Sequence, residues 1–365
     1  NLFNDTGPLI SEIVSGLLSN FKTPETSTSI NLSRKEVLYP ARILIIILSD
    51  MWRLGLTKQS ENFLAEVLST IQKIVSGIKG DDLIPGGAFW LTNVRELYSF
   101  VVYAEKTILH DDSYNDGIDD AEFKEYLKLV ADLRDDFEAL SYNVYNLWVK
   151  KLEKDLEKKI VPAVVLHQAL PGFVSSENSN LLPKFFASGT PSYKMDDILT
   201  FLNNIYWSLK NYHVEADIFT SVITTLLRFI DSVAFNDIIM RKNFLSWKRG
   251  LQLHYNVTRL EEWCRGHHIA EGTDCLKHMM QVAKLLQIKK ATTEDIDIVF
   301  EVCSALKPVQ IQKLLSLYAV ADYETPLPEN IAKYLAEKVK NSDKSSKTDT
   351  KSKPVFLPMN SGPFK

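Results

Sequence analysis

The apolar residues of this chain recur every three or four positions along almost its whole length, and the alternating pattern of β-strands is nearly absent. The spacing is clearest within residues 243–264. Four apolar residues there stand at i, i+4, i+7 and i+11, namely Leu253, Val257, Leu260 and Cys264. At about 100° per residue, they fall on one narrow face of an α-helix. The sequence therefore predicts an all-α fold of packed helix bundles.

The predicted helix Asn243–Cys264 carries a second row of side chains on its opposite face. Its members, each four residues after the last, are Trp247, Leu251, Tyr255 and Arg259. A helix with two such faces is either fully buried or offers one face to a binding partner. Gly250 lies in mid-helix, where glycine costs up to about 1 kcal/mol relative to alanine. We therefore expect a neighbouring element to approach closely at Gly250.

Most other segments also have helical period. The longest is Asp119–Lys159, whose core stripe consists of Leu133, Phe137, Leu140, Val144 and Leu147. Arg42–Leu54 is apolar on all sides and is predicted to be a buried helix. Residues 80–87 are predicted to form a turn before a helix at Phe89–Leu109. Later helices are expected at Asp196–Tyr212, Glu215–Arg241, Thr273–Gln287, Thr293–Leu306, Pro308–Tyr318 and Pro328–Val339.

A polar segment rich in serine, asparagine, glycine and proline, Pro171–Lys194, is the expected boundary between two subdomains. We therefore expect helix bundles at residues 1–180 and 181–340, joined through the long helix and this polar loop. Residues 341–365 begin with a Ser/Thr/Lys-rich segment and are expected to form a flexible tail. Because the chain starts without methionine, we also expect it to be a fragment or a processed product.

Composition argues against several classes of function. The chain has 365 residues and a formal net charge of −4, so it lacks the basic excess of nucleic-acid-binding domains. Three cysteines without paired spacing, together with no signal peptide, favour a reducing cytoplasmic compartment. The longest uninterrupted apolar run, Ile43–Leu48, is too short to cross a bilayer. No direct membrane insertion is therefore expected.

No motif for enzymatic chemistry is found. The chain has no Walker loop, no dinucleotide-binding glycine pattern and no metalloprotease or nucleophile-elbow motif, so we expect neither an enzyme nor a cofactor. The strongest metal candidates are two Cys-x-x-His pairs, Cys264 with His267 and Cys275 with His278, next to His268. Their spacing does not match that of zinc fingers, and Cys264 ends the core stripe, where cysteine acts as a small apolar residue. We therefore expect no metal.

Four longer motifs resemble the globular tails of class V myosins, in particular those of the organelle-transporting members from budding yeasts. Asn243-Phe-Leu-Ser-Trp-Lys-Arg-Gly and Val257-Thr-Arg-Leu-Glu-Glu-Trp are similar to the dilute-domain signature of that family. Arg42-Ile-Leu-Ile-Ile-Ile-Leu-Ser-Asp-Met-Trp-Arg-Leu-Gly-Leu and Phe89-Trp-Leu-Thr-Asn-Val-Arg-Glu-Leu-Tyr-Ser-Phe are similar to the fungal tails. The resemblance covers residues 34–364. It implies a further helical segment after Lys365.

The resemblance implies a cargo-binding tail of an actin-based motor. Its expected partners are adaptor proteins of the vacuole, mitochondria and peroxisome, Rab GTPases and the exocyst on secretory vesicles, and a kinesin-related protein. It also implies dimerisation of the full-length motor through an upstream coiled coil, and a cytoplasmic location on actin cables, at the bud tip and at the bud neck. The residues alone leave an alternative open, a helical scaffold or vesicle-tethering subunit without a motor.

One candidate binding surface lies on the long helix. Asn143 and Asn146 are poor helix formers three residues apart in mid-helix, and such local inconsistencies occur preferentially at functional sites. The alternative is that both side chains bond only to solvent or to a nearby loop. The resemblance implies that vacuolar and mitochondrial adaptors bind at Asp136, Leu140, Asn143 and Asn146.

The second candidate surface surrounds the row that begins at Trp247. Tyr255 and Arg259 are the stronger candidates, because both residue types are enriched among interface anchors. Trp247 and Leu251 fit a buried position equally well. On the next predicted helix, Lys284 and Gln287 flank the apolar stripe and could be exposed. The resemblance implies that secretory-vesicle Rab GTPases and other receptors bind at Leu251, Tyr255, Arg259, Lys284 and Gln287, and Trp247 is added as their neighbour on the row.

Overall fold

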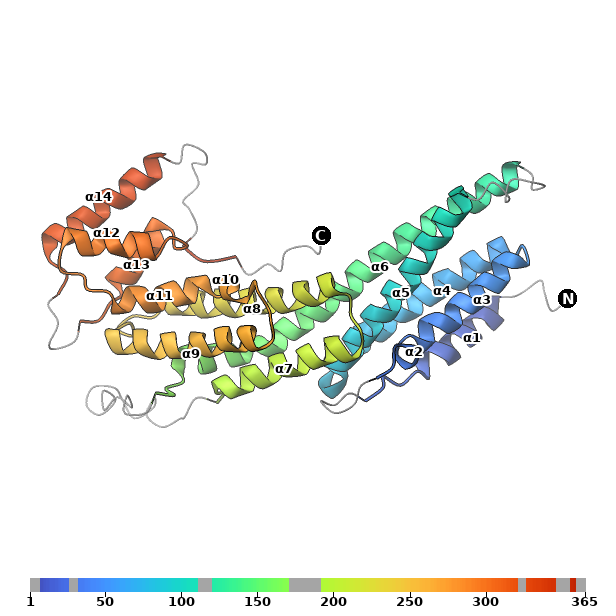
Figure 1. The fold of residues 1–365 in the computed structure, drawn as a ribbon, viewed down its shortest axis with the longest axis horizontal. Helices are drawn as coiled ribbons and strands as arrows, with labels where there is room; N and C mark the ends of the chain where they lie inside the picture. Colours follow the sequence, from blue (N-terminus) through green and yellow to red (C-terminus); the bar gives the residue numbers. More distant parts are fainter. Residues whose placement is uncertain are drawn as a thin grey trace. The chain divides into compact units, whose positions relative to one another are not determined.

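The computed structural model describes residues 7–25, 32–110, 120–170, 192–320, 326–345 and 355–358. In these ranges the chain forms α-helices joined by short turns, and no β-strand occurs among them (Figure 1). A single parallel bridge joins Leu245 to Tyr318. The all-α prediction is therefore confirmed.

The helices begin close to where the apolar periodicity begins. In chain order they are α1 (Gly7–Ser19), α2 (Arg34–Val37), α3 (Tyr39–Arg53), α4 (Thr57–Gly77), α5 (Leu83–His110), α6 (Asp120–Ile160), α7 (Met195–Asn211), α8 (Ala216–Ile238), α9 (Trp247–Gly266), α10 (Gly272–Cys275), α11 (Lys277–Gln287), α12 (Thr293–Val302), α13 (Pro308–Ser316) and α14 (Glu329–Ser345). A 3₁₀ turn at Gly80–Asp82 precedes α5, and a π-helical turn at Val161–Leu166 follows α6.

Contacts divide the chain into two compact units. Unit 1 contains the residues up to Leu152 together with Asn203–Phe219, and unit 2 contains Glu153–Leu202 and the residues from Thr220 onward. The division therefore falls inside α6, α7 and α8 rather than in a loop. The expected boundary at residue 180 lies outside the described residues, and that subdomain map remains a prediction.

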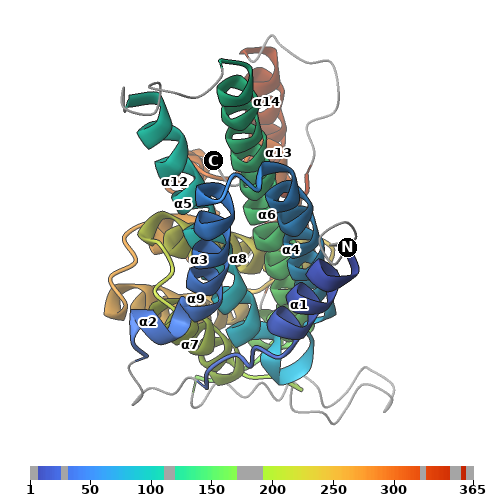
Figure 2. The same ribbon diagram turned by 90° about the vertical axis from the view of Figure 1, so that its right-hand side faces the viewer.

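In unit 1, α4 packs against α1 and α3, and α3 also packs against α5 (Figure 2). Asn93 fixes the start of α3 on α5. Its buried amide accepts a hydrogen bond from Ala41 N at 3.1 Å and donates to Val37 O at 3.0 Å and Phe89 O at 2.9 Å. The junction of α2 with α3 is thus held by a side chain whose own hydrogen bonds are satisfied inside the core.

The start of α5 corrects one prediction. Residues 83–87 are helical, not a turn, because α5 begins at Leu83. Pro85 is tolerated there, since the first turn of a helix needs no N–H donor. Gly87 is required by packing: a Cβ on it would lie 2.1 Å from Trp148 Cδ1. The Trp148 indole lies directly over this glycine and donates to Leu83 O at 2.9 Å.

One further prediction about unit 1 is refined. Helix α3 is not buried on all sides: Leu44 and Leu48 are buried, but the Ile46 side chain is 61% exposed.

Lys151 of α6 caps the C-terminal end of α4. Its ammonium donates to the carbonyls of Val75, Ser76 and Ile78 at 3.0, 2.8 and 3.0 Å. Val75 and Ser76 lie in the last turn of α4, where the carbonyls have no i+4 partner, although Val75 O also accepts from Ile78 N at 3.4 Å.

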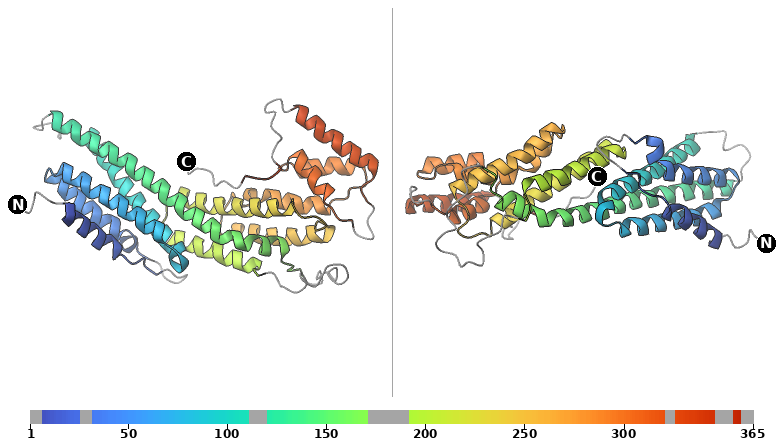
Figure 3. Two further views of the ribbon diagram at one scale, coloured as in Figure 1. Left: turned by 180° about the vertical axis from the view of Figure 1, so that it is seen from behind. Right: turned by 90° about the horizontal axis from the view of Figure 1, so that it is seen from below.

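In unit 2, α9 lies along α11 (Figures 1 and 3). Gly250 explains the closeness of the pair, because a Cβ on it would lie 2.8 Å from Leu286 Cβ and 3.1 Å from Ala283 O. The expectation of a close neighbour at this glycine is confirmed. The predicted core stripe is also confirmed, since Leu253, Val257, Leu260 and Cys264 are all buried.

Helix α9 starts later than predicted. It begins at Trp247, after Ser246 caps it by accepting a hydrogen bond from Arg249 N at 3.3 Å. Asn243 has a φ of +54°, a left-handed conformation that ends any helix running through it. Leu245 O instead accepts from Ala319 N at 2.6 Å. The predicted helix Thr273–Gln287 is likewise divided, into α10 and α11.

Helix α8 was not singled out by its apolar content in the sequence, although it is long and apolar enough to cross a membrane by length and composition. In the fold, 78% of its most apolar window is buried. The core helices of globular proteins can be as long and as apolar, so this helix is weak evidence for a membrane span. Its Asp231 carboxylate is buried as well and accepts from Met279 N at 2.8 Å.

Candidate partner-binding surfaces

The candidate surface on α6 combines exposed polar side chains with a buried stripe. Asp136 and Asn143 are exposed, and Asn146 is half-buried. Leu140 is only 4% exposed and belongs to the core of unit 1. Asn146 donates to Tyr142 O, one turn earlier, at 2.9 Å. This bond shows how a poor helix former is accommodated, and it leaves the Asn143 amide as the more accessible of the two.

Negative charge gathers at one end of this surface. Partial burial raises the pKa of Asp136 above its usual value, and repulsion from Asp132 and Asp135 adds to the effect. Arg134 does not neutralise Asp136, since its guanidinium is engaged by Asp135 at 2.8 Å and by Glu105 of α5 at 2.9 Å. The α6 surface therefore presents a carboxylate that would gain from a cation brought by a partner.

The candidate surface of unit 2 is built around α9. Trp247 and Leu251 are half-buried, whereas Tyr255 is 39% exposed. The row is therefore neither fully buried nor fully exposed, and Tyr255 is its most accessible apolar member. With a large ring and a hydroxyl at its tip, Tyr255 has the chemistry of an interface anchor.

Helix α11 adds two side chains to this surface, which behave differently. Lys284 is exposed, as expected. Gln287 is half-buried, because its amide contacts α9 and its own helix. It donates to Ala283 O at 2.9 Å and to Gly250 O at 3.3 Å, and it lies 3.1 Å from His254 Nδ1. Gln287 therefore holds α11 against α9.

Arg259 connects the same surface to the start of α7. Its guanidinium bonds to Asp196 Oδ1 at 2.5 Å, and this hydrogen bond and charge lower the pKa of Asp196. The Asp196 side chain is 73% exposed, so the pair is largely solvated. A partner that binds Arg259 must compete with Asp196.

Sequence reasoning missed two buried amides on α9. Asn256 donates to Val164 O and His167 O at 3.0 Å each, and Gln252 accepts from Leu170 N at 3.2 Å. They hold the chain that follows α6 onto α9. Their signal was present as two amide residues four apart, each directly before a member of the core stripe, but such spacing does not reveal a partner more than 80 residues away.

The cysteines and histidines considered for a metal have other roles. Cys264 and Cys275 are buried free thiols, and burial raises the pKa of Cys264 to about 12. His267 Nδ1 lies 2.8 Å from Trp263 O, and His278 Nδ1 lies 2.6 Å from the buried Asp231 carboxylate. In the part of the chain that is described, no group of three or more metal-binding side chains converges.

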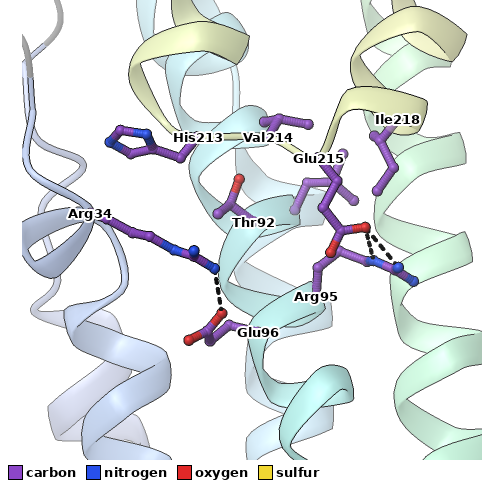
Figure 4. A pocket seen from close by; sticks show the side chains of 9 residues that line it. Arg34, Thr92, Arg95, Glu96, His213, Val214, Glu215 and Ile218 are labelled. Atoms are coloured by element: carbon purple, nitrogen blue, oxygen red, sulfur yellow. Dashed lines mark hydrogen bonds and ion pairs between the residues drawn. The ribbon is translucent and has the colours of Figure 1, made fainter. Parts of the chain in front are cut away.

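A cleft in unit 1 was not foreseen. It lies between α2, α5 and the start of α8 and has a cavity volume of only about 20 Å³ (Figure 4). Two ion pairs flank it, Arg34 with Glu96 at 3.3 Å and Arg95 with Glu215 at 2.8 Å. The buried Thr92 hydroxyl between them has no hydrogen-bond partner. His213, Glu96 and Glu215 also line the cleft, but none of them is hydrogen-bonded to this hydroxyl.

A family model named "DIL domain" matches residues 221–322, which lie in unit 2 and include α9 and α11. Among curated proteins, Myosin-2 of Lachancea kluyveri is 64% identical over 366 residues, and Myosin-2 of Saccharomyces cerevisiae is 56% identical over 369. Both matches cover 100% of this chain but only 24% and 23% of those proteins. The chain thus spans about a quarter of the length of these relatives.

Solved structures of similar length also match over the whole chain. Three of them are described as Myo2-GTD in complex with Smy1, with Inp2 and with Mmr1. Each superposes with a TM-score of 0.87 at 53–54% identity, covering 100% of this chain and 87% of the other. This agreement in sequence and fold favours a motor tail over an unrelated helical scaffold. The chain belongs to the cargo-binding globular tails of class V myosins.

Proposed function

We propose that this chain docks cargo adaptors for an actin-based class V motor through two separate surfaces and has no enzymatic activity of its own. The observation that carries the proposal is the full-length match to three tail structures described as complexes with Smy1, Inp2 and Mmr1.

The α6 surface is proposed to bind adaptors of the vacuole and mitochondria. Asp136 and Asn143 supply accessible polar groups beside the buried Leu140. The crowded carboxylates favour a partner segment with a basic residue opposite Asp136. Such a segment would be disordered when free and would fold on binding.

The surface around α9 and α11 is proposed to bind Rab GTPases and other vesicle receptors. Tyr255 is its accessible anchor, and Lys284 and Arg259 give it positive charge. The exocyst, a kinesin-related protein and peroxisomal adaptors complete the proposed partners. We further propose that the motor dimerises through an upstream coiled coil and acts in the cytoplasm on actin cables, at the bud tip and at the bud neck.

The decisive experiment measures both ligand classes on two variants. Asn143→Asp adds a charge to the α6 surface without changing its shape, and Lys284→Glu reverses a charge on α11. Because the sites have no shared partners, each variant should weaken one class of ligand and leave the other within about threefold, or about 0.6 kcal/mol. Calorimetry with a purified adaptor segment and a purified Rab provides the measurement. Equal losses of both ligands in both variants would contradict two separate surfaces.

A further inference from the structure

The segment 355–358, Val-Phe-Leu-Pro, is held in unit 2 by its main chain. Asn236, in the last turn of α8, donates to Leu357 O at 2.9 Å, and Leu357 N donates to Asn236 Oδ1 at 2.8 Å. One side-chain amide thus pairs with both polar main-chain groups of one residue. An adjacent β-strand offers the same pair of hydrogen bonds to an extended chain.

A second side-chain amide, that of Gln310, bonds to the segment two residues earlier, at Val355. Gln310 of α13 donates to Val355 O at 2.7 Å, and its own Oε1 accepts from Lys307 N at 2.8 Å. Gln310 is 0% exposed. Its amide is therefore fixed in orientation by the cap of α13, and it presents one donor to the segment.

The hydrogen bonds to this segment engage its main chain and not its side chains. The Phe356 side chain, between the two residues whose main chains are hydrogen-bonded, is 46% exposed. Val355 and Leu357 are only half-buried. Because the hydrogen bonds engage main-chain groups that any residue except proline can offer in full, another chain with the same bend as residues 355 and 356 could make the same bonds.

We propose that Asn236 and Gln310 form a peptide-binding site, occupied by the chain's own residues 355–358 and open to competition by a segment of a partner protein that adopts the same bend. The partner segment carries apolar side chains two residues apart, in the positions of Val355 and Leu357, and no proline at the second. This site is a third docking surface. It shares no residue with the α6 surface or with the surface around α9 and α11.

A labelled probe peptide with the sequence of residues 353–360 tests the proposal. It is added to the full chain and to the Leu357→Pro variant, which loses the N–H that bonds to Asn236. Fluorescence anisotropy should show binding at least about tenfold tighter to the variant, as expected when an occupied site becomes free. Adding Asn236→Ala to Leu357→Pro should abolish the gain. Alanine is the better helix former, so α8 should persist.

Peptide variants provide the matched controls. A probe with alanine in place of Phe356 should bind within about twofold of the original, since that side chain points largely to solvent. A probe with proline in place of Leu357 should not bind. An unrelated flexible peptide with valine and leucine two residues apart should displace the probe.

Two results would overturn the proposal. Equal probe affinity for the wild-type chain and the Leu357→Pro variant would show that residues 355–358 are a fixed part of the fold. Failure of every unrelated peptide to compete would show that the site accepts only the chain's own tail. Neither result would bear on Asn143 or Lys284, so it would leave the two surfaces proposed above to their own test.

Discussion

The surface on α6 and the surface around α9 and α11 are built in different ways. On α6, the exposed Asp136 and Asn143 belong to a single helix, and within the described part of the chain neither is hydrogen-bonded to another element. Around α9, Gln287 bonds to a neighbouring helix and Arg259 pairs with the start of α7. The difference teaches that residues of the first surface can change with little cost to folding. Several residues of the second surface hold neighbouring elements together, in addition to the recognition proposed for them.

The largest expected effect comes from separating α9 and α11. Gly250→Ala would place a Cβ 2.8 Å from Leu286 Cβ, so we expect a loss of about 1–3 kcal/mol in the free energy of unfolding. Rab binding should fall with it, while adaptor binding to α6 should remain. Urea unfolding and calorimetry provide the measurements.

Gly266→Ala is the matched control for this change, because a Cβ there meets no atom within 4 Å. It should leave stability within about 0.5 kcal/mol of the wild type. If both glycine variants were equally stable, the close packing of α9 on α11 would be refuted as the basis of this surface.

A second change tests recognition without packing. Tyr255→Arg places bulk and charge on the most accessible apolar member of the row, so vesicle-receptor binding should weaken by about tenfold or more. The free energy of unfolding should stay within about 0.5 kcal/mol, as is usual for surface substitutions. Thermal melting followed by circular dichroism checks the fold. A loss of several degrees would assign Tyr255 to the core instead.

Arg259→Gln should have a smaller effect, which depends on pH. Its partner Asp196 is mostly exposed, so losing the pair costs at most about 1 kcal/mol. The folded-state pKa of Asp196 lies below its usual value of 3.8, so the stabilisation is present above that value and is lost as pH falls through the folded pKa. Denaturation at pH 7 and near pH 2 should therefore show a difference that vanishes in acid. A difference that persists near pH 2 would mean that Arg259 acts through packing.

Asp136→Asn should have the smallest effect on the fold and the opposite sign. The pKa of Asp136 is raised, so its ionised form opposes folding above the folded pKa and ceases to do so as pH falls below it. At pH 7 the variant should be as stable as the wild type or slightly more so. Adaptor binding should weaken by about two- to fivefold, the value of one exposed charge pair. Unchanged adaptor affinity would remove Asp136 from the surface.

The spacing of apolar residues was enough to predict features that depend only on the position of a residue along one helix. The stripe that includes Leu253 and Val257, the mid-helix close approach at Gly250 and the long helix α6 all follow from local spacing. The exposure of Asn143 follows in the same way. The apolar residues at i, i+3 and i+4 define the buried face of α6, and Asn143 lies off that face.

Features that depend on distant residues could not be predicted. Asn236 is hydrogen-bonded to a residue 121 positions later in the chain, and Asn256 to one 92 positions earlier. A single amide in a sequence is equally consistent with a solvated surface. The helical start of α5 was missed for the same reason, because Gly87 is required by the distant Trp148 ring rather than by a turn.

The closure of α4 by Lys151 limits how the surface charge of this tail could be redesigned. Three carbonyls converge on one ammonium, whose three donors can point to all of them. The donors of a guanidinium lie in one plane, so they cannot point to three carbonyls that surround a single nitrogen. Charge-swapping schemes that exchange lysine for arginine across the surface would therefore have to spare this one position, and acetylation of its amine would leave the carbonyls at the end of α4 without their shared donor.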